Sequence, residues 1–206
     1  YHQKCALTQN GIDLNIFHPY PEKVWGANRK IRILSVGSAD VGFKGIVDTL
    51  DAVEFLKQKG IEVELIRVSP GIPSRREKEG DLVHQFLTGV KEKEMAELYR
   101  DADIFISSSL EGEGFGLPAI EALASGVPSI LTDISTYRNF NENKDFAYFV
   151  PTHSPEKIAE GIESFIMNVE FRNKCIENGL RVAHAFSLER TKNDLIKFMR
   201  DLHSEN

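Results

Sequence analysis

Residues 107–133 read Ser-Ser-Ser-Leu-Glu-Gly-Glu-Gly-Phe-Gly-Leu-Pro-Ala-Ile-Glu-Ala-Leu-Ala-Ser-Gly-Val-Pro-Ser-Ile-Leu-Thr-Asp. The apolar run at 104–106 precedes this stretch and predicts a buried strand. A glycine loop follows the strand, with glycines at Gly112, Gly114 and Gly116. Pro118 suits the first turn of a helix, Gly126 suits its end, and residues 127–131 predict the next strand. Strand, glycine loop, helix and strand in this order are typical of α/β proteins.

The glycine loop has the features of a phosphate site. Glycines let the backbone approach a ligand closely, and a helix N-terminus offers free N–H groups and the positive end of its dipole. Glu113 lies in the loop and Glu121 in the first turns of the helix. Because helical side chains lean toward the N-terminus, Glu121 is expected to point back to the loop and accept hydrogen bonds from ribose hydroxyls. The alternative is that both carboxylates are solvated surface charges.

The run from Glu113 to Pro128 resembles the Glu-x7-Glu signature of the retaining, GT-B-fold glycosyltransferases of family four, also called glycosyl transferases group 1. Further segments resemble that family in the same order: Asn-Gly-Ile-Asp at 10–13, Phe-His-Pro at 17–19, Val-Gly at 36–37, Lys-Gly at 44–45, the segment 86–103, and Phe-Ser-Leu-Glu-Arg at 186–190. The resemblance covers nearly the whole chain, but only the C-terminal, nucleotide-sugar-binding half of such an enzyme.

Strands that alternate with helices predict an α/β fold, and the resemblance implies the same. The expected architecture is a Rossmann-like, doubly wound, mainly parallel sheet with helices on both faces, which is one half of a GT-B fold. Residues 1–30 are expected to form the crossover linker between domains, and residues 31–185 the donor-binding domain. Residues 186–206 are expected to form a helix that in the family returns to the N-terminal domain, so its apolar face is exposed or re-docked without that domain.

Two other segments carry expectations of their own. The charged run 74–81 predicts a solvated, mobile loop. The C-terminal third predicts helices over 155–168, 171–185 and 187–202.

The reaction that the resemblance implies is sugar transfer from a nucleotide-diphosphate-sugar with retention at the anomeric carbon, mannosyl- or glucosyl-type, in polysaccharide or glycolipid synthesis. Lys44 would stabilise the leaving diphosphate, and Glu113 would lie near the donor sugar, with Glu111 as a competing candidate. Glu121 would hold the ribose. The other donor-binding positions are Gly37, Ser38, Gly89, Val90, Lys91, Gly114, Phe115, Gly116 and Leu117.

The position of Lys44 predicts an anion site independently of the resemblance. A lysine at the start of a helix is unfavourable with respect to the dipole, unless an anion binds there and is shared by the ammonium and the helix N–H groups. An ordinary exposed lysine is the alternative.

Neither a metal nor another cofactor is expected, because the resemblance implies that Lys44 and the loop N–H groups replace a divalent cation. The six histidines form no ligand pattern such as His-Glu-x-x-His. Cys5 and Cys175 are distant in sequence and lie in no metal-like cluster, so a reduced chain is the simplest reading, with a disulfide left open.

Composition limits the partners. A length of 206 residues with 41% hydrophobic residues fits one large domain with short extensions. The net charge of -6 argues against a nucleic-acid partner, and no apolar run is long enough to span a membrane. The expected location is cytoplasmic. The full enzyme would bind a sugar or lipid-linked sugar acceptor on its N-terminal domain, with possible peripheral membrane association.

The sequence departs from the family pattern beside Lys44. Family members often carry an arginine there, but the corresponding places hold Ser38 and Phe43, so a positive charge is missing unless Arg67 or the N-terminal domain supplies it. This departure favours one alternative, a non-catalytic nucleotide-sugar-binding or regulatory subunit. A second alternative is a nicotinamide-dependent Rossmann enzyme, but residues 36–42 read Val-Gly-Ser-Ala-Asp-Val-Gly in place of Gly-x-Gly-x-x-Gly.

Overall fold

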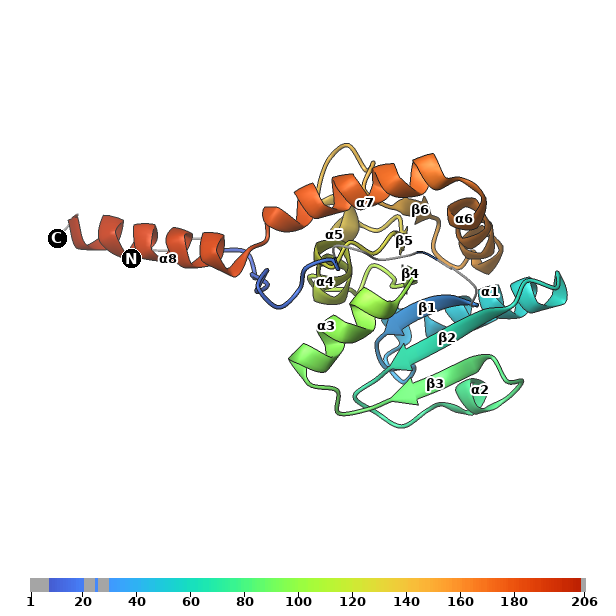
Figure 1. Cartoon of the computed structure of the whole chain (residues 1–206). Helices are drawn as coiled ribbons and strands as arrows, with labels where there is room; N and C mark the ends of the chain where they lie inside the picture. Colours follow the sequence, from blue (N-terminus) through green and yellow to red (C-terminus); the bar gives the residue numbers. More distant parts are fainter. Residues whose placement is uncertain (1–7, 21–24, 26–29, 205–206) are drawn as a thin grey trace.

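A six-stranded parallel sheet forms the centre of the protein (Figure 1). The computed structural model describes residues 8–20, 25 and 30–204. The strands, in the spatial order β3-β2-β1-β4-β5-β6, are β1 (Ile31–Val36), β2 (Val63–Val68), β3 (Val83–Leu87), β4 (Ile104–Ser107), β5 (Ser129–Thr132) and β6 (Tyr148–Val150). The predicted doubly wound parallel sheet is therefore confirmed.

Helices follow the strands along the chain. They are α1 (Ile46–Gln58), α2 (Arg75–Lys78), α3 (Glu92–Asp101), α4 (Leu117–Ala124), α5 (Ser135–Arg138), α6 (Pro155–Met167), α7 (Val169–His184) and α8 (Leu188–Ser204). A 3-10 turn, η1 (Gly42–Lys44), precedes α1. The three C-terminal helices lie within a few residues of the predicted ranges.

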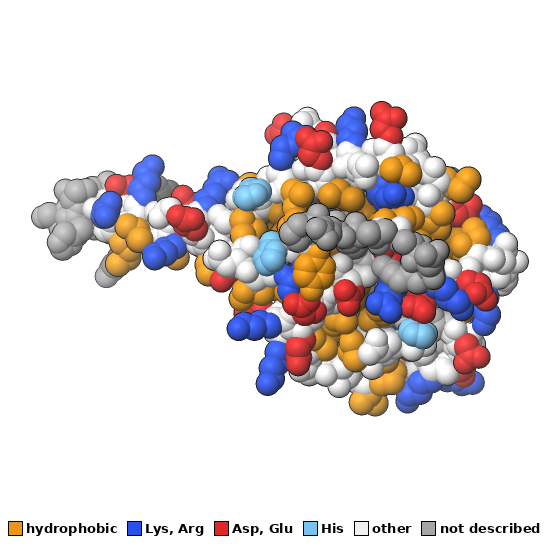
Figure 2. Space-filling model, viewed as in Figure 1, with side chains coloured by type: hydrophobic (Ala, Val, Ile, Leu, Met, Phe, Trp, Pro, Cys, Tyr) orange, Lys and Arg blue, Asp and Glu red, His pale blue; other side chains and the backbone are white. Residues whose placement is uncertain are grey.

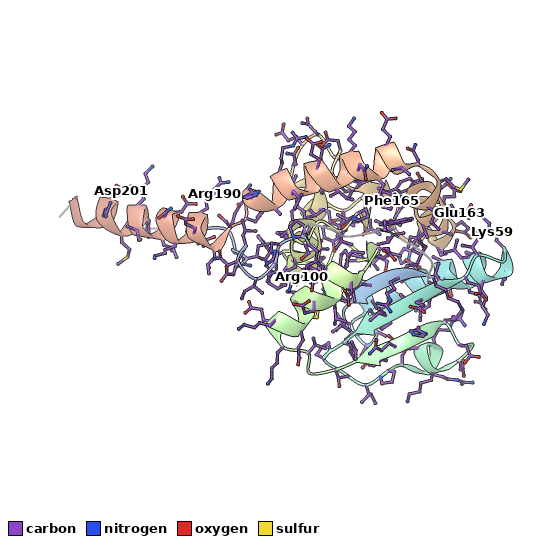
Figure 3. The ribbon with its side chains drawn as sticks, in the orientation of Figure 1. Lys59, Arg100, Glu163, Phe165, Arg190 and Asp201 are labelled. Atoms are coloured by element: carbon purple, nitrogen blue, oxygen red, sulfur yellow. The ribbon has the colours of Figure 1, made fainter. Side chains whose placement is uncertain are left out.

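Helices cover both faces of the sheet. Consecutive residues of a strand point to opposite faces, so each strand sends side chains into two apolar clusters. One cluster packs strand residues against α3 and α4 and includes Leu34, Ile66, Phe105 and Leu131. The other packs strand residues against α1 and α6 and includes Ile33, Leu65, Ile104 and Ile130. Each strand therefore contributes apolar side chains to both clusters, which explains the continuous apolar runs in the sequence. The ion pair between Lys59 and Glu163 joins α1 to α6 at the outer edge (Figure 3).

The loops that follow β1 and β4 meet where the strand order reverses. The backbone N–H of Leu110 donates to the carbonyl of Phe43 at 2.6 Å. Gly45 has φ +59, and a Cβ at this residue would lie 2.0 Å from the Ser108 carbonyl oxygen, so the contact requires glycine. Parallel α/β sheets bind ligands in the crevice at such a reversal point. The loop that carries Lys44 and the loop that carries Glu113 therefore meet between β1 and β4.

The prediction of a mobile loop at 74–81 is wrong. Residues Arg75–Lys78 form α2, and Ser74 and Glu77 form a capping box at its start. Glu77 is buried and accepts a hydrogen bond from Arg67 at 2.9 Å. The run looks solvated in sequence because most of its charges are exposed, and composition does not distinguish the one glutamate that is the counter-ion of a buried arginine.

Arg67 belongs to the scaffold of the crevice. Its side chain is 0% exposed, and besides Glu77 it donates to the Ser35 carbonyl at 2.6 Å and to the Gly37 carbonyl. Burial lowers the pKa of Arg67 from its ordinary value, and the attraction of Glu77 opposes that shift. The idea that Arg67 supplies the missing positive charge to a ligand is therefore wrong, because the guanidinium has no path to the crevice.

The start of α1 differs slightly from the prediction. Lys44 is the last residue of η1, and α1 begins at Ile46 after Gly45 in the left-handed conformation. At the break, Gly45 lies against the Ser108 carbonyl, in the loop after β4. Lys44 is therefore held in a turn that precedes the helix.

The described part of the linker packs against the domain. Ile12 and Phe17 are buried in the cluster that contains α3 and α4, and the Ile12 N–H donates to the Phe186 carbonyl at 2.9 Å. Arg100 lies on α3 (Figure 3), and its guanidinium carbon is 5.0 Å from the ring centre of Tyr20. Residues 1–7, 21–24 and 26–29 of the predicted linker, Cys5 among them, lie outside the described residues. Cys175 is buried and has a free thiol.

Helix α8 extends away from the sheet. Arg190 lies in its first turn, next to the end of α7, and Asp201 lies outside the body of the domain (Figure 3). Apolar side chains are visible on it between charged ones (Figure 2). Leu188, Leu195 and Met199 are exposed, Met199 by 65%. The predicted apolar face is therefore exposed in this chain. The division of the chain into linker, domain and returning helix stays a prediction.

Substitution of Gly116 by alanine should lower the free energy of unfolding by about 2–3 kcal/mol, because a left-handed backbone is unfavourable for alanine and its Cβ would crowd a buried ring. Gly116 has φ +79, and an added Cβ would lie 2.6 Å from Tyr137 Cε1. Gly60 is the matched control, since it has φ +76 and faces open space. Gly60→Ala should cost only about 1 kcal/mol. Urea denaturation measures both, and equal costs would contradict the packing argument.

Candidate nucleotide-binding site

An ion pair joins the two loops of the crevice. Lys44 Nζ lies 2.6 Å from Glu113 Oε2, and the two side chains are 20% and 8% exposed. Ser109 Oγ donates to the same carboxylate oxygen at 3.0 Å, and Thr136 Oγ1 donates to the Glu113 backbone carbonyl at 2.6 Å. Two residues that the sequence predicted from separate motifs are thus in direct contact. Lys44 is not an ordinary exposed lysine.

The two acids of the glycine loop have different surroundings. Glu111 is exposed and accepts from the Ser135 hydroxyl at 2.6 Å and from the Ser135 N–H at 3.2 Å, at the start of α5. The side-chain hydrogen bond from Ser135 lowers the pKa of Glu111. Of the two candidates, the structure therefore brings Glu113 to Lys44 and directs Glu111 to α5.

The start of α4 presents unused donors to the crevice. Gly116 is the N-cap residue, no side chain caps the helix, and no acid lies in its first turn. Within the part of the chain that the structure describes, the backbone N–H groups of 114–117 have no hydrogen-bond acceptor. The positive end of the α4 dipole is therefore uncompensated, and together with Lys44 it suits a ligand anion.

Glu121 lies farther along α4 and is held by a tyrosine. Tyr99 Oη on α3 donates to Glu121 Oε2 at 2.9 Å. Burial raises the pKa of Glu121, and the Tyr99 hydrogen bond opposes this rise. The reading of Glu113 and Glu121 as solvated surface charges is wrong, because the first is nearly buried and the second is half-buried.

The remaining predicted positions lie at the same edge of the sheet. Gly37 has φ +142, and an added Cβ would lie 3.1 Å from Lys44 Cδ, so the glycine lets the lysine side chain pass close to the backbone. Ser38 is buried, and its hydroxyl accepts from the Asp40 N–H at 3.3 Å. Gly89, Val90 and Lys91 connect β3 to α3, and Lys91 is the N-cap residue of α3. Their role with a nucleobase stays a prediction.

A cavity of about 520 Å³ lies beside the glycine loop. Glu113, Gly114 and Phe115 line one side of it, and Asn10, Thr136 and Asn139 are among its other residues. Thr136, Asn139, Ser109 and Tyr99 are not predicted as site residues from the sequence. Asn10 is predicted only as part of the Asn-Gly-Ile-Asp segment that resembles the family. Tyr99 had a usable signal, because a tyrosine on the inner face of a helix needs a partner for its hydroxyl.

Within the described ranges, neither a cluster of metal ligands nor a membrane-spanning helix is present. Among these residues, no three His, Cys, Asp or Glu side chains gather in a way that could hold a metal ion. None of the helices there has both the length and the apolarity needed to cross a bilayer. Independence from metals stays a prediction.

The six-stranded parallel sheet and its helices match one half of the GT-B fold. Sucrose-phosphate synthase from Thermosynechococcus elongatus superposes with a TM-score of 0.79 at 22% identity, over 96% of this chain and 52% of that one. Anabaena HepE, solved in complex with UDP-glucose, superposes with a TM-score of 0.76 at 18% identity, over 96% of this chain and 57% of that one. These similarities establish the shared fold.

The family follows from the sequence match. The model for "Glycosyl transferases group 1" matches residues 22–182, and the chain belongs to that family. Phosphatidyl-myo-inositol mannosyltransferase of Mycobacterium leprae is 24% identical over 86% of this chain and 48% of that protein. MMP alpha-(1->4)-mannosyltransferase of Mycolicibacterium hassiacum is 34% identical over 58% of this chain and 29% of that protein. The chain thus spans about half the length, or less, of these relatives.

Proposed function

We propose that this chain is the donor-binding domain of a retaining glycosyltransferase and that it binds a nucleotide-diphosphate-sugar in the crevice between β1 and β4. The Lys44–Glu113 ion pair at 2.6 Å carries the proposal, because it places a cation and a carboxylate beside the free N–H groups of α4. A diphosphate needs the cation and the N–H groups, and a sugar needs the carboxylate.

The proposed mechanism uses these groups at the leaving diphosphate. Negative charge grows on the phosphate oxygens as the bond to the sugar breaks. The Lys44 ammonium and the N–H groups of 114–117 would stabilise that charge, in a setting prearranged by the fold. Glu113 would hold the donor sugar or stabilise positive character at the anomeric carbon. Both steps are proposed to use the protein's own groups at the positions where a divalent metal could otherwise act.

The proposed donor sugar is mannosyl or glucosyl. The named relatives include mannosyltransferases, and HepE was solved with UDP-glucose. The cavity beside Glu113 has amide and hydroxyl side chains next to phenylalanine rings, which is suitable chemistry for a hexose. The acceptor, a sugar or lipid-linked sugar, would bind to the part of the enzyme that this chain does not span.

A non-catalytic nucleotide-sugar-binding or regulatory role is the second candidate. The absence of an arginine beside Lys44 favours it, since Ser38 and Phe43 occupy those places and Arg67 is buried. Transfer of sugar by the full-length protein to a panel of lipid-linked acceptors separates the two roles. Measurable transfer supports the enzyme, and nucleotide-sugar binding without transfer supports the regulatory role.

Calorimetric titration with uridine, guanosine and adenosine diphosphates, alongside NAD, tests the binding proposal. At least one nucleoside diphosphate should bind clearly more tightly than NAD. The crevice offers a cation and N–H donors, and the terminal phosphate of a nucleoside diphosphate carries more negative charge than the doubly esterified pyrophosphate of NAD. The preferred base also identifies the donor nucleotide. Tighter binding of NAD, or no binding of any diphosphate at millimolar concentration, would contradict the proposal.

A further inference from the structure

We propose that Tyr99 is a positioning residue for the ribose of the bound nucleotide. It holds the Glu121 carboxylate by one oxygen and leaves the other oxygen to accept from a ribose hydroxyl. This inference rests on the proposed function, because it concerns the same nucleotide. Tyr99 itself would not touch the ligand.

The ring of Tyr99 is immobilised by its neighbours. The side chain is 0% exposed, and the ring centre lies 6.0 Å from that of Phe17 and 5.8 Å from that of Phe105. The phenol oxygen is the only polar atom of this side chain, and a buried hydroxyl needs a partner. Glu121 is that partner, so the position of the hydroxyl is determined by the core and not by the ligand.

The donor and the acceptor of the Tyr99–Glu121 hydrogen bond are determined by their chemistry. A carboxylate only accepts, so Tyr99 Oη donates to Glu121 Oε2 at 2.9 Å. Burial, followed by the nearby Glu121 charge, raises the pKa of Tyr99 well above its ordinary value, so the phenol keeps its proton at neutral pH. One tyrosine proton satisfies one oxygen. Within the described chain, Glu121 Oε1 has no donor, and it remains available to a ligand hydroxyl.

A held carboxylate binds a hydroxyl more tightly than a mobile one. A glutamate loses rotamer freedom when a ligand fixes it, whereas Tyr99 fixes Glu121 before the ligand arrives. Tyr99 also lies on α3 and Glu121 on α4, so the hydrogen bond ties the ribose contact to two helices of the same core. The two residues are 22 positions apart in the sequence, so the contact forms only when α3 and α4 pack together.

The test compares the best-binding nucleoside diphosphate with its 2′,3′-dideoxy analogue, by calorimetry on wild type and Tyr99→Phe. Wild type should prefer the ribose form. In Tyr99→Phe, binding of the ribose form should weaken by about 3–10-fold, while binding of the dideoxy form stays within about 2-fold. Glu121→Gln should reduce the preference as well, and adding Tyr99→Phe to Glu121→Gln should cause little further loss.

Tyr137→Phe is the matched control. Tyr137 is another buried tyrosine, and its hydroxyl bonds to Ser107 and not to Glu121. Tyr137→Phe should change binding of both ligands by the same factor. An equal effect of Tyr99→Phe on both ligands, or no effect on either, overturns the inference. If wild type binds a diphosphate without preferring ribose, the inference also fails; if wild type binds no diphosphate, the proposed function fails first.

A ligand-free measurement gives a second readout. The hydrogen bond from Tyr99 lowers the pKa of Glu121 against the effect of burial. Titration of the Glu121 carboxyl carbon by NMR should therefore give a higher pKa in Tyr99→Phe than in wild type. An unchanged Glu121 pKa would show that the tyrosine does not hold the carboxylate, and would overturn the inference whatever the ligand does.

Discussion

Replacement of Arg67 by methionine should lower the free energy of unfolding by about 3–5 kcal/mol. Arg67 and Glu77 are both buried and lie 2.9 Å apart, so the substitution leaves the Glu77 charge without its partner. The Ser35 and Gly37 carbonyls lose their donors in the same step. The loss should be visible as a lower urea midpoint, with the crevice loop after β1 affected together with α2.

Two further variants separate the charge from the packing. Arg67→Met combined with Glu77→Leu removes both charges and should recover a large part of the lost stability, because a buried ion pair is often replaceable by apolar residues. Arg75 lies on α2 with Glu77, and its side chain is 91% exposed. Arg75→Met should therefore cost less than about 0.5 kcal/mol. A loss of less than about 1 kcal/mol in Arg67→Met alone would contradict the scaffold role.

Substitution of Lys44 by methionine should weaken binding of the preferred nucleoside diphosphate by about 10–100-fold, the usual size for loss of a charge-assisted hydrogen bond. The variant removes the cation and leaves the Glu113 carboxylate facing the phosphates, so repulsion adds to the loss. Calorimetric titration of wild type and variant measures the ratio of the two dissociation constants.

Lys157→Met is the matched control for the lost charge. Lys157 lies on α6, is exposed, and pairs with Glu160. Lys157→Met changes the net charge by the same amount as Lys44→Met. It should leave the dissociation constant within about 2-fold of wild type, because salt screens a charge that is far from the ligand.

Adding Glu113→Gln to Lys44→Met should restore part of the affinity. Equal binding by wild type and Lys44→Met would place the diphosphate elsewhere.

The fold and the centre of the site were predictable because their signals are local. The strand, glycine loop and proline of residues 107–133 predict a phosphate-facing helix start, and Lys44-Gly45 predicts a second loop at the same sheet edge. Parallel topology then brings the two loops together. The Lys44–Glu113 pair is a consequence of that topology, although the resemblance implies that the two residues act at different parts of the donor.

Most of the missed features depend on partners in other helices or strands. Arg67 is indistinguishable from a ligand-binding arginine until the sheet buries it beside Glu77. Tyr99 reads from the sequence as an ordinary inward-facing tyrosine. Its partner, Glu121, lies on α4 and is identified only by the packing of the two helices. Glu111 and Glu113 differ by two positions in sequence, and only the placement of α5 sends one to Ser135 and the other to Lys44. Helical periodicity indicates that Tyr99 faces inward and needs a partner, but it does not identify Glu121 as that partner.

NMR titration of the protein with the nucleoside diphosphate tests the central claim most directly. The amide chemical shifts that change identify the protein residues next to the ligand. The diphosphate is proposed to lie at the start of α4, between Lys44 and Glu121. The largest amide shifts on titration should therefore fall at 114–117 and at Lys44 and Gly45, with smaller shifts near Glu121. Saturable binding whose largest shifts lie elsewhere, with 114–117 unchanged, would contradict the account.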